Sequence, residues 1–330
     1  MATRLSPRRP GGRRTPTPPE WRQPQPALLV ALALLTVYLV WGSTYLGIRV
    51  AVQTLPPFMM ASVRFLTAGA LLWTWSIRRG DVEGDRIGPR QWGAAAIVGC
   101  LLLTTGNAMV GWGEQTVPSG IAALLVASMP LWMAVMSRGV LGERLGRRAA
   151  VGLLLGFAGV AMLVQPSGGE RLDPLGTAAI LFAAVSWALG SVWSRRLPLP
   201  SRPLVATSME MLAGGGLLAL LSLATGEFGR FDPHQVSGAS LLAVLYLIVF
   251  GSLLAFSAYV WLLGATSTSV LSTYAYVNPV IAVALGWALL GETINTGTLA
   301  GGVVIVTAVA LIVTRRPAAA AADEVPAPPR

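Results

Sequence analysis

Long apolar runs alternate with short polar connections from residue 28 to residue 314. A helix needs about 20 mostly apolar residues to cross the roughly 30 Å hydrocarbon core of a bilayer. The runs predicted to cross are 28–50, 57–77, 91–112, 116–137, 147–164, 174–194, 203–224, 238–263, 268–290 and 297–314. The pattern therefore predicts an all-α integral membrane protein with ten transmembrane helices.

The composition agrees with a membrane location. Apolar residues make up 54% of the 330 residues, charged residues only 12%, and the mean hydropathy is +0.65. A soluble domain has about 25% charged residues, so this chain has too few polar residues to cover a water-facing surface. The 37 glycines allow helices to approach closely, which predicts a tightly packed bundle.

The net charge of +10 is the next feature, and its placement matters more than its size. All 24 basic residues are arginines, and most lie at the ends of the apolar runs. If the N-terminus lies inside, the inner segments hold 20 arginines and the outer segments three, while Arg64 lies within a span. This asymmetry predicts that both termini are cytoplasmic, and it reads as a topology signal rather than as a nucleic-acid-binding surface. We expect no nucleic-acid partner.

Both ends of the chain are predicted to be disordered cytoplasmic tails. Residues 1–26 contain seven prolines and six arginines, and residues 315–330 are rich in alanine and proline. Neither segment has enough apolar surface to offset the entropy lost on ordering.

Most soluble enzyme chemistry is excluded by residue counts. Cys100 is the single cysteine, and His234, in a polar stretch expected to be an exposed outer loop, is the single histidine. A cysteine-cluster metal site, a histidine-based triad and, without lysine, an ATP-binding P-loop are therefore not expected. We predict no cofactor, no metal and no catalytic residue, so the chain is not expected to be an enzyme.

An internal duplication divides the chain into two repeats, 27–165 and 174–314. A shift of 146 residues places Trp41 on Trp187, Ser62 on Ser208 and Gly69 on Gly215. A shift of 149 residues places Trp112 on Trp261, Pro130 on Pro279 and the LGE sequence at 141–143 on that at 290–292. Because five spans is an odd number, the second repeat must be inverted in the membrane. The fold expected is two inverted five-helix repeats.

Inverted repeats are typical of alternating-access carriers, which hold their substrate near the bilayer midplane where the repeats meet. The leading function is therefore a secondary transporter of a small organic solute, with export expected. Import remains an alternative, because topology does not set direction. A lipid-modifying membrane enzyme is a weaker alternative, because the concentrated acids at 81–85 lie in an arginine-rich loop that reads as solvated.

Aromatic and polar residues inside the spans are the candidate binding residues. Trp41, Thr44 and Tyr45 share one face of the first helix, and Trp187 and Ser191 repeat that pattern in the second repeat. The other candidates are Asn107, Trp112, Tyr259, Tyr276 and Asn278. These side chains would line a substrate cavity. An interfacial aromatic belt, core filling or hydrogen bonding between helices explains the same residues without a ligand.

Arg64 and Glu210 occupy equivalent positions in the two repeats, with the charge reversed. An ionisable residue within a bilayer is a functional candidate by default, so both are candidates for charge coupling, with Glu210 a possible proton carrier. The alternative is that each side chain snorkels towards its own interface.

Prolines and glutamates mark two further equivalent positions. Pro130 and Pro279 remove backbone hydrogen bonds within apolar runs and are candidate gating kinks, or else fixed packing kinks. Glu143 and Glu292 each follow a glycine at a helix end, where we expect a structural role.

Several of these motifs together resemble the EamA family of the drug/metabolite transporter superfamily. They are WGSTYLGIRVA at 41–51, ASVRFLTAGALL at 61–72, NPV at 278–280, the two Gly-Glu turns, and the paired apolar segments 152–164 and 301–313. The resemblance covers about 28–314. It implies a ten-helix carrier of the bacterial inner membrane, usually an exporter of amino acids, related metabolites or toxic compounds. The implied partners are a small solute and the lipid bilayer, and a homodimer is an assembly that the sequence leaves open.

Overall fold

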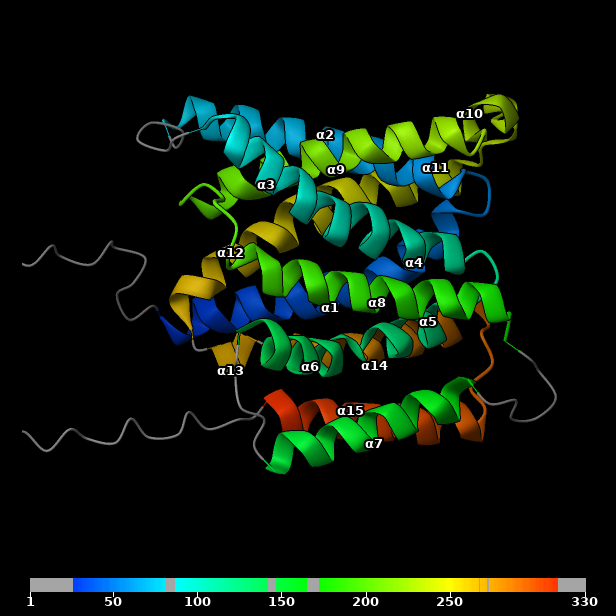
Figure 1. Ribbon diagram of the computed structural model, residues 1–330. Helices are drawn as coiled ribbons and strands as arrows, with labels where there is room; N and C mark the ends of the chain where they lie inside the picture. Colours follow the sequence, from blue (N-terminus) through cyan, green and yellow to red (C-terminus); the bar gives the residue numbers. More distant parts are fainter. Residues whose placement is uncertain are drawn as a thin grey trace, which may run out of the picture.

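The computed structural model describes residues 26–80, 87–141, 147–164, 172–266, 268–271 and 273–313. Every regular element in these ranges is helical, as expected from the apolar runs. The helices lie side by side with their axes roughly parallel (Figure 1). Apart from Pro26, the predicted tails lie outside the described residues, as does Glu143.

Helices occur at all the predicted positions, with some of the runs divided. The first half contains α1 (Ala27–Ala51), α2 (Pro57–Arg78), α3 (Pro89–Gly99), η2 (Cys100–Asn107), α4 (Ala108–Gly113), α5 (Ser119–Val126), α6 (Met129–Leu141) and α7 (Arg147–Val164). The second half contains α8 (Pro174–Ser194), α9 (Pro203–Ala224), α10 (Glu227–Arg230), η3 (Pro233–Gln235), α11 (Gly238–Tyr246), η4 (Leu247–Leu254), α12 (Ala255–Ala265), α13 (Thr268–Leu271), α14 (Tyr274–Leu290) and α15 (Thr296–Val313).

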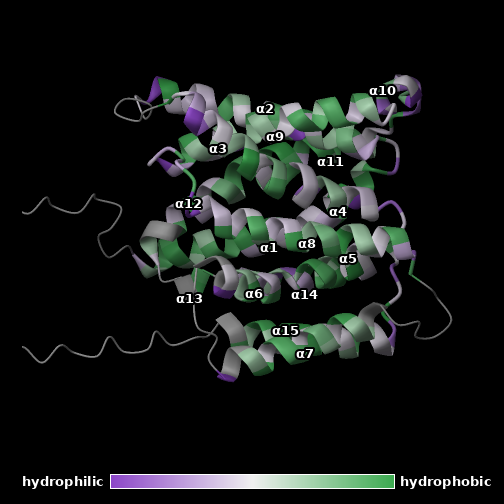
Figure 2. Ribbon diagram, viewed as in Figure 1, coloured by the Kyte–Doolittle hydropathy of each residue, from purple (hydrophilic) through white to green (hydrophobic). Residues whose placement is uncertain are grey.

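Six helical stretches among the described residues are long and apolar enough to cross a membrane. They are Ala27–Ala51, Pro89–Gly113, Ser119–Met136, Pro174–Ser194, Pro203–Ala224 and Gly238–Leu262. Three shorter apolar helices cover Ala150–Met162, Val277–Leu290 and Thr296–Leu311. Apolar residues follow the lengths of the helices, while hydrophilic residues gather at their ends and in the connections (Figure 2). The count of ten spans stays a prediction.

Proline and glycine set several helix boundaries. Proline occupies the first position of α2, α3, α8 and α9, where its missing N–H has no helical partner to lose. At the other end of a helix, Gly291 follows α14 with a φ of +66°, a left-handed conformation that closes a helix and favours glycine.

Two of the predicted spans are interrupted before their prolines. The run 116–137 divides into α5 and α6, with Pro130 in the first turn of α6. The run 268–290 divides into α13 and α14, with Pro279 inside α14. A proline cannot donate to the preceding turn and clashes with it, which accounts for the break before Pro130, whereas α14 continues past Pro279.

The helices α2 and α9 pack against each other in antiparallel orientation. The Arg202 guanidinium, at the start of α9, donates to the Gly80 carbonyl just past the end of α2 (3.3 Å). At the opposite end, the Glu227 carboxylate beyond α9 accepts from the backbone N–H of Met59 near the start of α2 (2.8 Å). Most of the largest buried cluster lies around this pair and α1, with Phe65, Met211 and Leu247 among its members.

Reciprocal glycine contacts bring α2 and α9 close together. A Cβ atom built on Gly69 would lie 3.0 Å from the Leu212 backbone nitrogen. A Cβ atom built on Gly215 would lie 3.0 Å from the Leu66 backbone nitrogen. The shift of 146 residues converts each contact into the other, so the same surface serves on both helices.

Gly99, on α3, makes the tightest approach to α9 and supplies a test of packing. Its Cβ atom would lie 2.5 Å from the Glu210 backbone oxygen, whereas Gly93 on the same helix has nothing within 4 Å. We expect Gly99→Ala to destabilise the protein by about 1–3 kcal/mol through overpacking. Gly93→Ala is the matched control and should be neutral or slightly stabilising. Thermal unfolding in detergent measures both, and equal melting temperatures would contradict this packing.

Candidate functional site

Arg64 lies at the centre of a polar cluster within the helices. Its side chain is only 5% exposed, and its guanidinium lies over the Phe65 ring, 4.8 Å from the centroid. Arg64 Nε donates to Ser252 Oγ (2.9 Å), and Nη1 donates to Asn107 Oδ1 (3.3 Å). Both partners are neutral, and no carboxylate among the described residues pairs with Arg64. This buried cation is therefore held by neutral groups, two hydrogen-bond acceptors and one aromatic ring.

Both partners of Arg64 come from π-helical segments. Asn107 ends η2, and Ser252 lies within η4, which occupies the equivalent place in the second half. A π-helical turn widens the helix and displaces side chains from the regular register, and such turns are frequent at functional sites. Gly251 also faces the cluster, because its Cβ atom would lie 3.4 Å from Arg64 Nη2 and 3.2 Å from Thr44 Cγ2.

An aromatic cluster adjoins Arg64 through the same glycine. Trp41 Nε1 donates to the Gly251 carbonyl (3.2 Å). The Trp41 ring lies 6.0, 5.1 and 5.3 Å, between centroids, from Phe256, Tyr259 and Tyr274. A guanidinium beside several aromatic faces suits a ligand with a charged or strongly polar group and an apolar or planar body.

The remaining candidates on α1 and α8 lie around this centre in different ways. Thr44 Oγ1 donates to the Trp41 carbonyl on its own helix (2.6 Å). Tyr45 packs against another buried apolar cluster, whose members include Leu125, Ile180 and Ile305. Trp187 packs against Met129 and the neighbouring side chains of α6, away from the Trp41 cluster. Ser191 Oγ donates to the Trp187 carbonyl (2.8 Å). The two tryptophans thus contribute to separate clusters.

Asn278 and Glu210 are buried candidates on α14 and α9. The Asn278 amide nitrogen is oriented to donate to the backbone carbonyls of Tyr274 and Tyr38 (3.3 Å each), which joins α14 to α1. Glu210 is 9% exposed and forms no ion pair with Arg64. The side chain of Tyr276 lies outside the described part of the structure.

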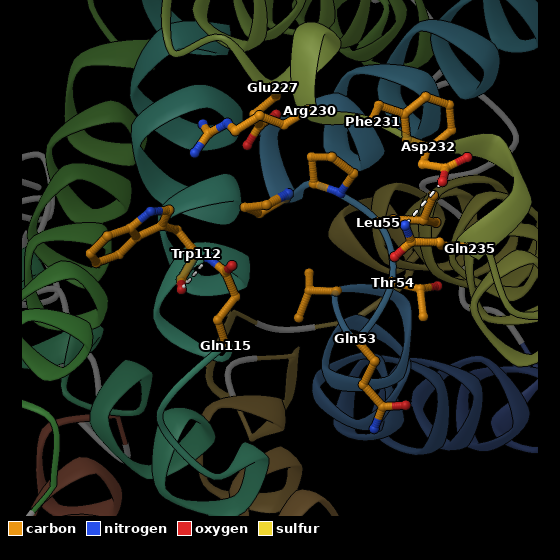
Figure 3. Close-up of a pocket in the computed structure, with 13 residues that line it drawn as sticks. Gln53, Thr54, Leu55, Trp112, Gln115, Glu227, Arg230, Phe231, Asp232 and Gln235 are labelled. Carbon is orange, nitrogen blue, oxygen red and sulfur yellow. Dashed lines mark hydrogen bonds between the residues drawn. The ribbon is translucent and has the colours of Figure 1, made fainter.

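A separate pocket of about 420 Å³ opens at one end of the bundle. Its lining comes from residues 52–57, Trp112, Gln115, Glu227, residues 230–232 and Gln235. Figure 3 shows Trp112 and Gln115 on one side of the pocket, and Thr54 and Gln235 on the other. The candidate Trp112 therefore belongs to this pocket and to the adjoining apolar cluster. Polar side chains dominate the pocket, so it suits a hydrated entrance.

Carboxylates cap helix N-termini at the same end. Glu292 accepts from Ser119 N (2.7 Å), Ser119 Oγ (2.8 Å) and Gly120 N (3.0 Å) at the start of α5. The structural role expected for Glu292 is thus helix capping across the two halves. Asp173 accepts from Gly176 N (2.7 Å), and this hydrogen bond is the main cause that lowers the Asp173 pKa below its ordinary value. The stability that this cap provides is lost as the pH falls through that lowered pKa.

Some residues of the central cluster were not predicted from the sequence. Gly251 and Ser252 lie in the apolar run of the eighth predicted span, where a Gly-Ser pair reads as ordinary helix packing. Glu227 gave no signal, because it reads as a polar residue in a connection.

The chain is similar to known membrane transport proteins. The model of the EamA-like transporter family matches residues 28–165 and again residues 174–314. The inner membrane transporter YedA of Escherichia coli (strain K12) is 43% identical over 283 residues, which cover 83% of this chain and 89% of YedA. A probable amino-acid metabolite efflux pump of Salmonella typhimurium is 26% identical over 83% of this chain and 91% of its own length. A solved crystal structure, 26% identical, matches with a TM-score of 0.59 over 86% of this chain and 95% of its own.

Proposed function

Because the chain belongs to the EamA-like transporter family, we propose that it is a secondary carrier that exports a small organic solute across the inner membrane by alternating access. In this proposal two inverted five-helix repeats, 27–165 and 174–314, rock around a site between them. Both termini are cytoplasmic, in agreement with the arginine distribution. A homodimer is a further prediction, which native mass spectrometry in detergent would test.

The observation that carries the proposal is the reciprocal packing of α2 and α9. Gly69 against Leu212 and Gly215 against Leu66 are the same contact made twice, which is what a pseudo-two-fold axis between repeats requires. The family model matches twice in the same two halves. The equivalent π-helical segments η2 and η4 add a third correspondence.

The substrate site we propose is the cluster around Arg64, Asn107, Ser252 and Trp41. A buried guanidinium with only neutral partners is well suited to receive a carboxylate or another anionic group, which would supply the missing charge. The Trp41 cluster would then hold the apolar part of the same solute. The similarity to an amino-acid metabolite efflux pump agrees with this chemistry.

The remaining candidates have subsidiary roles in the proposal. Tyr45, Trp187, Ser191, Tyr259 and Asn278 would line or support the pathway. Pro130 and Pro279 would act as gating kinks, because each lies close to a break between helices. Trp112 would line the entrance at the end of the bundle. Import through the same site is the alternative direction, and the family and the names of the relatives point to transport rather than to lipid-modifying enzyme chemistry.

Transport of labelled solutes tests the function. Purified protein in vesicles is offered a panel of amino acids and related metabolites, with and without a pH gradient. We expect at least one anionic or zwitterionic solute to move, and Trp41→Ala to reduce its transport by about tenfold, since a buried aromatic contact contributes on the order of 1–2 kcal/mol.

Trp193→Ala is the matched control, because Trp193 is 41% exposed on the outside of α8 and should leave the rate unchanged. If well-folded protein moves no solute of the panel, the carrier function is wrong. Cysteine labelling tests the topology separately: residues near 144 and 293 found on one side of the bilayer would contradict the inverted repeats.

A further inference from the structure

Glu114 is a buried carboxyl group without a partner. It follows the last residue of α4, is 0% exposed, and neither of its carboxylate oxygens makes a hydrogen bond among the described residues. Only its backbone is engaged: the carbonyl accepts from Arg49 Nη1, and the N–H donates to the Val110 carbonyl (2.8 Å). A carboxylate in this state would lose its hydration without compensation, whereas a neutral carboxyl group loses much less.

The charged and titratable neighbours come from several elements. Tyr45 and Arg49 of α1 and Glu292, just beyond α14, lie within electrostatic reach of Glu114. Glu292 accepts three hydrogen bonds at the start of α5, from Ser119 and Gly120. Asp173, just before α8, accepts a hydrogen bond from Thr116 Oγ1 (2.9 Å) and lies near the surface.

These surroundings favour a proton on Glu114. Burial raises the pKa of Glu114 well above its ordinary value, the Glu292 charge raises it further, and Arg49 opposes them with the smallest of the three effects. The next residue, Gln115, is exposed and lines the polar pocket at this end of the bundle. The Glu114 carboxyl group is thus unfavourable to ionise where it is buried, and the residue that follows it opens onto this pocket.

We propose that Glu114 is a proton-binding site that couples the opening of this end of the bundle to pH. With the end closed, the Glu114 carboxyl group is neutral and buried near Tyr45 and Arg49 of α1 and Glu292 beyond α14. When the end opens, its O–H bond breaks, the proton passes to water in the pocket, and the carboxylate that remains is hydrated and lies near Arg49. Reprotonation allows the end to close again. This inference rests on the proposed function, because opening of this end is a step of the proposed transport cycle. Proton binding by Glu114 itself does not depend on transport.

The state of the proton is measured directly by infrared spectroscopy of the full-length protein in detergent. We expect a protonated-carboxyl band at neutral pH that Glu114→Gln reduces, because glutamine keeps the shape of the neutral group without the titratable oxygen. Glu210→Gln is the matched control, since Glu210 is also a buried acid, 9% exposed in α9, and this change should leave the Glu114 contribution in place. A wild-type protein without the band, or a band that Glu114→Gln leaves intact, would overturn the proposal.

The link between the proton and opening is measured by cysteine labelling. In a Cys100→Ser background, Thr177→Cys reports on the closed end. Thr177 is 3% exposed, and its hydroxyl has no hydrogen-bond partner within the part of the chain that the structure describes. It follows Gly176, whose carbonyl packs on Gly113. Gln115→Cys is exposed and corrects for the reactivity of the thiol at each pH. Both cysteines are labelled with a water-soluble maleimide. We expect the labelling rate of Thr177→Cys, divided by that of Gln115→Cys, to rise about tenfold from acidic to alkaline pH.

Adding Glu114→Gln should hold this ratio at its low value at every pH. A labelling ratio that does not change with pH in the protein that retains Glu114 would overturn the proposal, and this result does not depend on whether a Glu114 variant folds. A ratio that rises with pH equally in the Glu114→Gln protein would also overturn it. A band and a pH-dependent ratio in a protein that moves no solute would contradict the carrier function and support the proton site.

Discussion

Arg64→Gln is expected to reduce transport by about 30-fold or more while leaving the protein at least as stable as the wild type. The loss of rate follows from removing the one buried cation of the central cluster, and truncating a buried charged contact costs a ligand about 2 kcal/mol or more. The gain in stability follows from the same charge. Arg64 is held by Ser252 and Asn107 without a carboxylate partner, so folding must bury it at a cost in free energy.

Stability and transport together separate a binding role from a structural one. If Arg64 served the fold, Arg64→Gln would lower the melting temperature in detergent along with the rate. Arg64→Lys is the second variant: it keeps the charge but cannot donate to Ser252 and Asn107 with the geometry of a guanidinium, so we expect an intermediate rate. The transport rate of the wild type, Arg64→Gln and Arg64→Lys is measured in vesicles with a solute that the wild-type protein moves. Wild-type rates in Arg64→Gln would remove this residue from the site.

The helical class could be predicted from the sequence because apolar periodicity and length depend on local residues. The ranges 57–77 and 203–224 correspond to α2 and α9 within one residue at each end. The repeat offset of 146 residues also reappears as a physical contact, Gly69 on Leu212 and Gly215 on Leu66. What the pattern did not contain was the division of long runs, such as η2 and η4, because a π-helical turn does not change the average hydropathy of a span.

The candidate site was predicted less completely, because its members meet through tertiary packing. Arg64, Asn107 and Trp41 were recognisable as polar or aromatic residues in apolar runs, and the structure places them around Gly251 and Ser252. The pairing of Arg64 with two neutral groups, one from each half, depends on how α2 lies against η2 and η4. No local pattern holds that information.

Connections were the least predictable part, since their polar residues look alike in sequence. Glu114, Glu227 and Glu292 are all acidic residues close to helix ends. The structure gives them different surroundings: Glu292 and Glu227 accept hydrogen bonds from helix N-termini, and Glu114 accepts none on its side chain. Their roles depend on which helix of the other half lies opposite, which sequence position alone does not specify.

Glu227→Ala is expected to destabilise the protein by about 3–5 kcal/mol, the largest loss among the acidic residues described. Glu227 is 6% exposed and accepts from Phe58 N (3.2 Å), Met59 N (2.8 Å) and Ser222 Oγ (2.8 Å). Removing the carboxylate leaves three buried donors without an acceptor, and each such group costs about 1–3 kcal/mol. The same change separates the start of α2 from the end of α9, where the two halves meet.

Two variants separate this cross-link from a simple helix cap. Glu227→Gln keeps one acceptor oxygen but turns an amide towards buried donors, so we expect a loss between those of wild type and Glu227→Ala. Asp173→Ala is the control, because Asp173 also caps a helix through Gly176 N but lies near the surface, where water replaces the lost acceptor. Its melting temperature in detergent should fall less than that of Glu227→Ala. Equal losses would mean that the burial of Glu227 between α2 and α9 contributes nothing beyond capping, and the antiparallel contact of the two halves would then depend on the glycine surfaces alone.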